Sequence, residues 1–209
     1  MSSTKGTSSI ERGDERVYDR PVSTDWIEKR AAAVLDTVPA WVWDGESLPV
    51  PVDDIVDSCF GLQVLEVDDM ARAPGCPPLD EGQTLSGLLL VDDKQIWCNA
   101  SEAQQWPSRK RFTIAHELGH WVLHKPGQQS LFCRRAVVVA DESARERERA
   151  QRPPLPVTEE EANVFAAALC MPAGLVEHHY RNTTREFGEL CEMFGSSGAA
   201  MSRRLRAVI

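Results

Sequence analysis

The sequence lacks the features that would place it in a membrane or among exported, disulfide-rich proteins. No apolar run approaches the roughly 20 residues that a transmembrane helix needs. The polar N-terminus contains no hydrophobic signal segment. The six cysteines form no CxxC pair and no dense framework, so we expect them to be reduced thiols. These absences predict a cytoplasmic protein that does not engage a membrane.

Positive charge is also scarce. The chain carries 23 Lys and Arg against 32 Asp and Glu, a formal net charge of −9. A nucleic-acid-binding protein needs a basic face to neutralise phosphates, so this balance disfavours direct DNA binding. Hydrophobic residues make up 42% and charged residues 26%, which is typical of a globular protein. A length of 209 residues suits one ordinary domain with a small appendage.

Hydrophobic periodicity predicts a mainly helical chain with a few short strands. The first 22 residues have no apolar periodicity and are predicted to be a disordered tail. The rest of the pattern predicts helices beginning near Ser23 and after Pro51, over 109–124 and from Thr158 to Met171, with two or three short helices after that. It predicts strands at 62–67, 85–91 and 95–98. The two strands at 85–91 and 95–98 are expected to form a hairpin. Residues 134–156, rich in Arg and Glu, are predicted to be an inserted loop.

The motif that carries chemistry is His116-Glu117-Leu118-Gly119-His120, in the predicted helix 109–124. Four residues make slightly more than one helical turn, so both imidazoles can reach one tetrahedral zinc ion. Glu117 then lies beside the open coordination position, where a carboxylate can act as a general base towards water. The alternative is a surface helix with two incidental histidines.

A catalytic zinc needs a third protein ligand. His124 follows His120 by four residues, but on a continuous helix it lies about 12 Å along the axis from His116. That distance is too long for the two side chains to share one ion. We expect His124 at the helix end, or in contact with a ligand rather than with the metal.

The acidic start of the later helix offers a better third ligand. Glu159 and Asn163 are spaced i, i+4 and share a helix face, so Glu159 can bind the metal while Asn163 orients an imidazole. The alternative is that the glutamates only complement the helix dipole, and this is the favoured interpretation of Glu160 and Glu161.

Two further clusters have functional and ordinary interpretations. His178, His179 and Tyr180 can stabilise an oxyanion near the metal, although a surface helix end is the commoner explanation. Residues 184–209 have a helix-turn-helix-like pattern with a basic second helix carrying Arg203, Arg204 and Arg206. Such a helix can contact DNA, but base-reading side chains are few.

Two long segments together resemble the ImmA/IrrE family of zinc metallopeptidases. Residues 109–120 fit the pattern R-x-R-F-T-x-A-H-E-x-G-H, and residues 159–172 fit E-x-x-A-N-x-F-A-x-x-L-x-M-P. The resemblance covers roughly residues 50–209. It implies that His116, His120 and Glu159 bind zinc and that Glu117 is the catalytic base. The sequence departs from the family in the 134–156 insertion and at Cys170, where Leu is usual.

The resemblance also implies an α+β, gluzincin-like fold. We expect a mainly helical zincin-like metallopeptidase domain over residues 23–183 with a small β-sheet, and a C-terminal helix-turn-helix-like subdomain over 184–209 that packs on it. Family members commonly cleave helix-turn-helix repressors, so the implied activity is a zinc endopeptidase with a repressor as its protein substrate. One zinc ion is implied, with manganese as the alternative for a His₂Glu site. The rival hypothesis is a regulatory module that binds a repressor or DNA through a zincin-like fold without hydrolysis.

Overall fold

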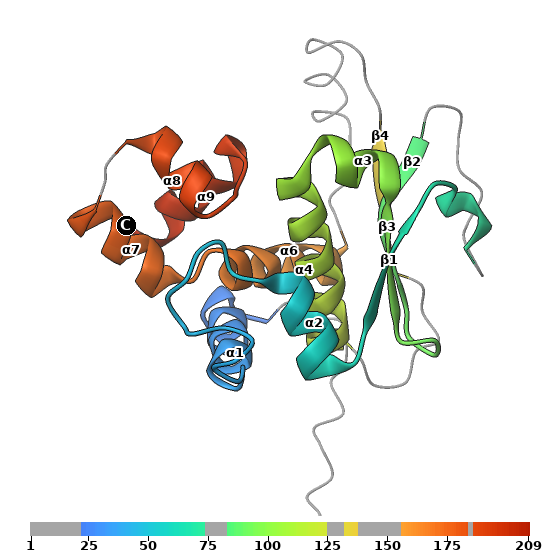
Figure 1. The fold of residues 1–209 in the computed structure, drawn as a ribbon, viewed down its shortest axis with the longest axis horizontal. Helices are drawn as coiled ribbons and strands as arrows, with labels where there is room; N and C mark the ends of the chain where they lie inside the picture. Colours follow the sequence, from blue (N-terminus) through green and yellow to red (C-terminus); the bar gives the residue numbers. More distant parts are fainter. Residues whose placement is uncertain (1–21, 74–82, 125–131, 138–155, 184–185) are drawn as a thin grey trace, which may run out of the picture.

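The computed structural model describes residues 22–73, 83–124, 132–137, 156–183 and 186–209, so the predicted tail lies outside it except for Val22. The architecture is α+β and mainly helical, as predicted, with the α-helices on one face of a small sheet (Figure 1). The helices are α1 (Thr24–Asp36), α2 (Val52–Phe60), α3 (Ala100–Gln105), α4 (Pro107–His124), α6 (Val157–Cys170), α7 (Ala173–Asn182), α8 (Phe187–Met193) and α9 (Gly198–Val208), with a short 3-10 helix η1 (Met70–Arg72). The strands are β1 (Gln63–Val67), β2 (Gln83–Leu90), β3 (Gln95–Asn99) and β4 (Phe132–Val137).

The described strands form one mixed sheet in the order β1-β3-β2-β4. The predicted hairpin is confirmed, because β2 and β3 pair antiparallel with Leu89 opposite Ile96. β1 joins the other side of β3 in parallel. β4 pairs antiparallel with β2, so residues 134–137 belong to the sheet and the prediction of a loop there is wrong. Of the rest of that predicted insertion, residues 138–155 lie outside the described residues, and Pro156 directly precedes α6.

The two faces of the sheet bury different clusters. Leu89 and Ile96 face the helices and join a core that includes α1, α2, α4 and α6. Leu88 and Leu90 point to the opposite face, where they pack with Met70 of η1. This alternation follows from the two-residue period of a strand, and it leaves the helix-facing side of β2 in contact with α4.

Two glycines allow α4 to lie close to its neighbours. A Cβ added to Gly87 of β2 would lie 2.2 Å from Thr113 Cγ2 on α4. A Cβ added to Gly119 of α4 would lie 3.2 Å from the Cα of Ala162 on α6. Because neither glycine has a side chain, β2 and α6 both approach α4 at the turns that carry the HELGH motif.

The helix ends follow local sequence signals in most places. The Ser23 side chain caps α1 by accepting a hydrogen bond from the backbone N–H of Trp26, as its position predicts. Pro107 occupies the first position of α4, where its missing N–H costs nothing. The segment Thr158-Glu159-Glu160-Glu161 also fits a capping box, which predicts that Thr158 caps the helix, and the structure contradicts this prediction. α6 begins one residue earlier, after Pro156, and no side chain caps it.

The last helices pack on the rest of the chain through the main core. Leu190, Phe194 and Met201 are fully buried there. The buried Arg204 of α9 pairs with Glu28 of α1 and donates to the carbonyl of Met171, which follows α6. None of the helices in the described part of the chain combines the length and apolar character that crossing a bilayer requires.

Candidate metal centre

Three side chains from two helices converge at the centre of the candidate site. His116 and His120 project from the same face of α4, with their Nε2 atoms 3.0 Å apart. Glu159, in the first turn of α6, places one carboxylate oxygen 3.3 Å from Nε2 of His116 and the other 3.1 Å from Nε2 of His120. Among the described residues these three form the group whose ligand atoms could hold a metal ion.

The donor set fits a divalent metal such as zinc. Two imidazole nitrogens and one carboxylate are a common set of protein ligands in catalytic zinc sites. His116 Nδ1 lies 3.1 Å from Asn163 Oδ1, which can only accept, so Nδ1 carries the proton and Nε2 presents a bare lone pair. That lone pair faces a second imidazole nitrogen and a carboxylate, an arrangement that a cation stabilises.

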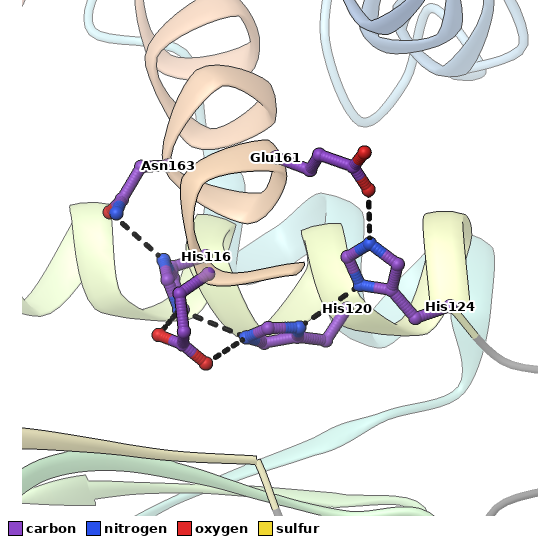
Figure 2. A network of polar contacts seen from close by, with 6 residues as sticks. His116, His120, His124, Glu161 and Asn163 are labelled. Carbon is purple, nitrogen blue, oxygen red and sulfur yellow. Dashed lines mark hydrogen bonds and ion pairs between the residues drawn. The ribbon is translucent and has the colours of Figure 1, made fainter. Parts of the chain in front are cut away.

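A line of polar contacts continues from the ligands into the protein (Figure 2). His120 Nδ1 lies 3.1 Å from His124 Nδ1, and His124 Nε2 lies 2.8 Å from Glu161 Oε2. His124 therefore contacts the candidate ligand His120 but is not one of the three candidate ligands. Glu161 is almost fully buried, so the expectation that it only complements the helix dipole is wrong, whereas Glu160 is exposed.

Burial sets the protonation of these groups. It lowers the pKa of His120, against the opposing effect of the hydrogen bond to Glu159. The pKa of His124 is lowered for the same reason, against its hydrogen bond to Glu161. Burial alone would raise the pKa of Glu159, but hydrogen bonds and charge interactions with His116 and His120 outweigh it and hold the pKa well below its ordinary value. Neutral imidazoles beside an ionised carboxylate are the states in which these groups bind metals.

Glu117 is fully buried at the contact between α4 and the sheet. A Cβ on Gly87 would lie 3.0 Å from Glu117 Oε1, which places the carboxylate against the backbone of β2. Cys98 lies opposite Gly87 on β3. Burial and then the charge of Glu117 raise the pKa of the Cys98 thiol to about 12, so this cysteine is a neutral thiol behind the carboxylate.

The second predicted cluster lies elsewhere. His178, His179 and Tyr180 are on α7, which follows the C-terminal end of α6, whereas Glu159 is at its N-terminal end (Figure 1). Fourteen residues of helix separate the two ends, about 20 Å at the usual rise. His178 and His179 contact neighbouring residues of the C-terminal region, including Asn182 and Phe194. The structure therefore does not bring this cluster to the candidate site.

Two residues of the site were missed by the sequence analysis. The burial of Glu161 depends on α1 and α4 packing around α6, which no local pattern reveals. Gly87 stands in a Leu-rich strand, and an isolated glycine in a strand is the available signal of a close backbone approach.

Comparisons with known proteins agree with the site. A family model described as the IrrE N-terminal-like domain of the M78 peptidases matches residues 93–206, just over half of the chain. This match spans both α4 and α6, and it supports a metallopeptidase-type function. A search of curated proteins finds no match. The chain belongs to the M78 peptidase family of IrrE N-terminal-like domains, the ImmA/IrrE family that its sequence resembles.

Proposed function

We propose that this protein is a zinc-dependent endopeptidase that hydrolyses a helix-turn-helix transcriptional repressor. The observation that carries the proposal is the convergence of His116, His120 and Glu159 at 3.0–3.3 Å, with Glu117 following His116 on α4. Family membership supports the peptidase part of the proposal. The choice of a repressor as substrate is supported by the family resemblance of the two motifs.

Each residue has a defined task in this reaction. His116, His120 and Glu159 would hold the ion, and Asn163 fixes the ring of His116 through Nδ1. A bound zinc ion would supply Lewis-acid polarisation of the scissile carbonyl and of water. Glu117 accepts the proton of the attacking water and delivers it to the nitrogen of the leaving amine. Its burial against β2 keeps bulk water away from the carboxylate and holds it in one place.

The variant Glu117→Gln tests the peptidase assignment. The substitution keeps the size of the side chain, but an amide cannot accept a proton from water, so zinc binding should persist while cleavage falls by at least about 100-fold. Glu160→Gln is the matched control, because Glu160 is an exposed glutamate near the site. The measurements are metal content of the purified protein and mass spectrometry of a repressor encoded nearby after incubation.

The outcomes separate the hypotheses. Full cleavage by Glu117→Gln would sink the peptidase mechanism. A wild-type protein that binds the repressor tightly, binds zinc and never cleaves would favour the rival non-hydrolytic module. Cleavage of a generic unfolded protein but not of any repressor would leave the peptidase assignment standing and overturn the substrate.

A further inference from the structure

Glu161 uses its two carboxylate oxygens for two different parts of the chain. Oε2 lies 2.8 Å from Nε2 of His124, on α4. Oε1 accepts a hydrogen bond of 2.8 Å from the backbone N–H of Val22, just before α1. The side chain of Glu161 is only 11% exposed. A carboxylate this buried is costly unless its acceptor sites are used, so both contacts matter to the fold.

The contact to His124 fixes the direction of every hydrogen bond up to the ligand. A carboxylate only accepts, so His124 Nε2 carries a proton. His120 needs a bare Nε2 to bind a metal, and its proton must therefore be on Nδ1. His124 Nδ1 is then the acceptor of that proton. The contacts at 2.8 and 3.1 Å satisfy this single arrangement without two donors meeting.

We propose that Glu161 is a positioning residue for the metal centre. Through its contact with His124 it sets the tautomer of the ligand His120, and through its contact with the Val22 N–H it couples that tautomer to the segment before α1. The inference rests on the proposed function in taking His120 as a metal ligand. Asn163 performs the corresponding task for His116 directly, because its Oδ1 accepts from Nδ1. Both ligand histidines are thus oriented from α6: His116 by direct contact with Asn163, and His120 by contact with His124, which contacts Glu161 (Figure 2).

The contact with Val22 explains why an amide could not replace the carboxylate. The Glu161→Gln side chain would offer one acceptor and one donor where the native carboxylate offers two acceptors. If the amide oxygen accepts from the Val22 N–H, the NH₂ group donates to His124 Nε2. His124 then carries its proton on Nδ1 and donates to His120 Nδ1, so that His120 Nε2 becomes protonated. If the amide oxygen instead accepts from His124 Nε2, the NH₂ group faces the Val22 N–H, and two donors are opposed. Each choice weakens either metal binding or the docking of the segment before α1.

The test is the zinc affinity of the full-length chain, measured by competition with a chelator. Glu161→Gln should bind zinc roughly 10- to 100-fold more weakly, the usual effect of losing a hydrogen-bond partner of a ligand. Glu160→Gln should match the wild type. Val22→Pro removes the competing N–H, so in the Glu161→Gln background it should recover most of the lost affinity. Val22→Ala keeps the N–H, is the control for side-chain loss, and should recover nothing.

Long-range ¹H–¹⁵N spectra of the wild-type histidines give a readout that needs no variant. His124 should be protonated at Nε2 and bare at Nδ1. A proton on Nδ1 of His124, or a Glu161→Gln affinity equal to that of Glu160→Gln, would overturn the positioning role while leaving the peptidase proposal intact. Failure of Val22→Pro to restore affinity would overturn the coupling to the N-terminal segment. A wild type that binds no zinc would overturn the proposed function itself.

Discussion

At the scale of single residues, the site depends on three buried histidines. His116 and His120 are at most 1% exposed, and His124 is 3% exposed. Protonating any of them would place a charge in a poorly solvated region and remove the lone pair that a metal or a neighbouring ring uses. Burial therefore makes the protonation of His120 and His124 costly in the folded protein.

The burial of His120 and His124 predicts the pH dependence of stability in the metal-free protein. Burial lowers the pKa of His120 and His124 below the ordinary value of 6.5. Below about pH 6.5 the unfolded chain therefore binds protons that the folded chain does not, and the free energy of unfolding must fall as pH falls. The lowered pKa of Glu159 acts in the same direction below its ordinary value of 4.5.

Urea unfolding at about pH 7.5 and about pH 5.5, on either side of the unperturbed histidine value, checks this. His124→Gln removes one of these groups and should flatten the dependence. Equal stability at the two pH values in the wild type would contradict the assignment of neutral, buried imidazoles.

Asn163 permits a second test at this scale. Asn163→Ala removes the acceptor of the His116 Nδ1 proton, so the ring loses both its orientation and its preferred tautomer. We expect about a 10-fold loss of zinc affinity. Asn182→Ala, which changes an exposed asparagine beside His178, should have no effect. Isothermal titration of zinc into the metal-free proteins measures both variants, and equal affinities would remove Asn163 from the site.

At the scale of elements, the site is made by how closely α4 approaches β2 and α6. Gly119 brings α6 near enough for Glu159 to reach the two histidines, and Gly87 brings the sheet to Glu117. These are backbone contacts, so a small change in spacing would move whole rows of side chains. Because interiors are close-packed, the cost of an added methyl group here is large.

Gly87→Ala tests this spacing. The new Cβ would lie 2.2 Å from Thr113 Cγ2, which forces β2 and α4 apart. The free energy of unfolding should fall by about 1–3 kcal/mol, and peptidase turnover should drop because Glu117 is displaced. Gly174→Ala is the matched control: nothing lies within 4 Å of its added Cβ, and a helical alanine should raise stability by up to about 1 kcal/mol. Wild-type stability and activity in Gly87→Ala would show that the close approach is dispensable.

The sequence predicts features set by local spacing, but not features set by contacts between elements that lie far apart in the sequence. The helical period and the HExxH spacing are local, so the face shared by His116 and His120 was predictable. Glu159 was reachable through its spacing from Asn163. Pairing of β4 with β2 was not predictable, because an edge strand is specified by its partner and not by its own pattern. The role of Glu161 was hidden for a related reason: its partners lie 37 and 139 residues away in sequence.

At the scale of the whole molecule, the C-terminal helices are held from three directions. Arg111 of α4 donates to the carbonyls of Phe194 and Gly195 after α8. Arg204 of α9 reaches the carbonyl of Met171 and the carboxylate of Glu28. One of the three arginines that suggested a DNA-binding helix is therefore engaged inside the protein, which weakens that alternative. We propose that the described C-terminal residues, 186–209, fold together with the peptidase part.

Arg204→Ala tests this proposal. Arg204 is 4% exposed, and removing it leaves the Glu28 carboxylate and the Met171 carbonyl without this donor. The Glu28 side chain is 27% exposed, so losing this partly buried pair should cost about 1–3 kcal/mol. Urea unfolding should show a single transition at lower denaturant for the entire chain. Arg203→Ala, at an exposed neighbouring position, should stay within about 0.5 kcal/mol of the wild type. A separate early transition confined to the C-terminal helices would show that they fold independently.

Salt-sensitive duplex binding that Arg203→Ala abolishes would instead revive the DNA-binding hypothesis, because an exposed arginine on α9 would then be the group that contacts phosphate.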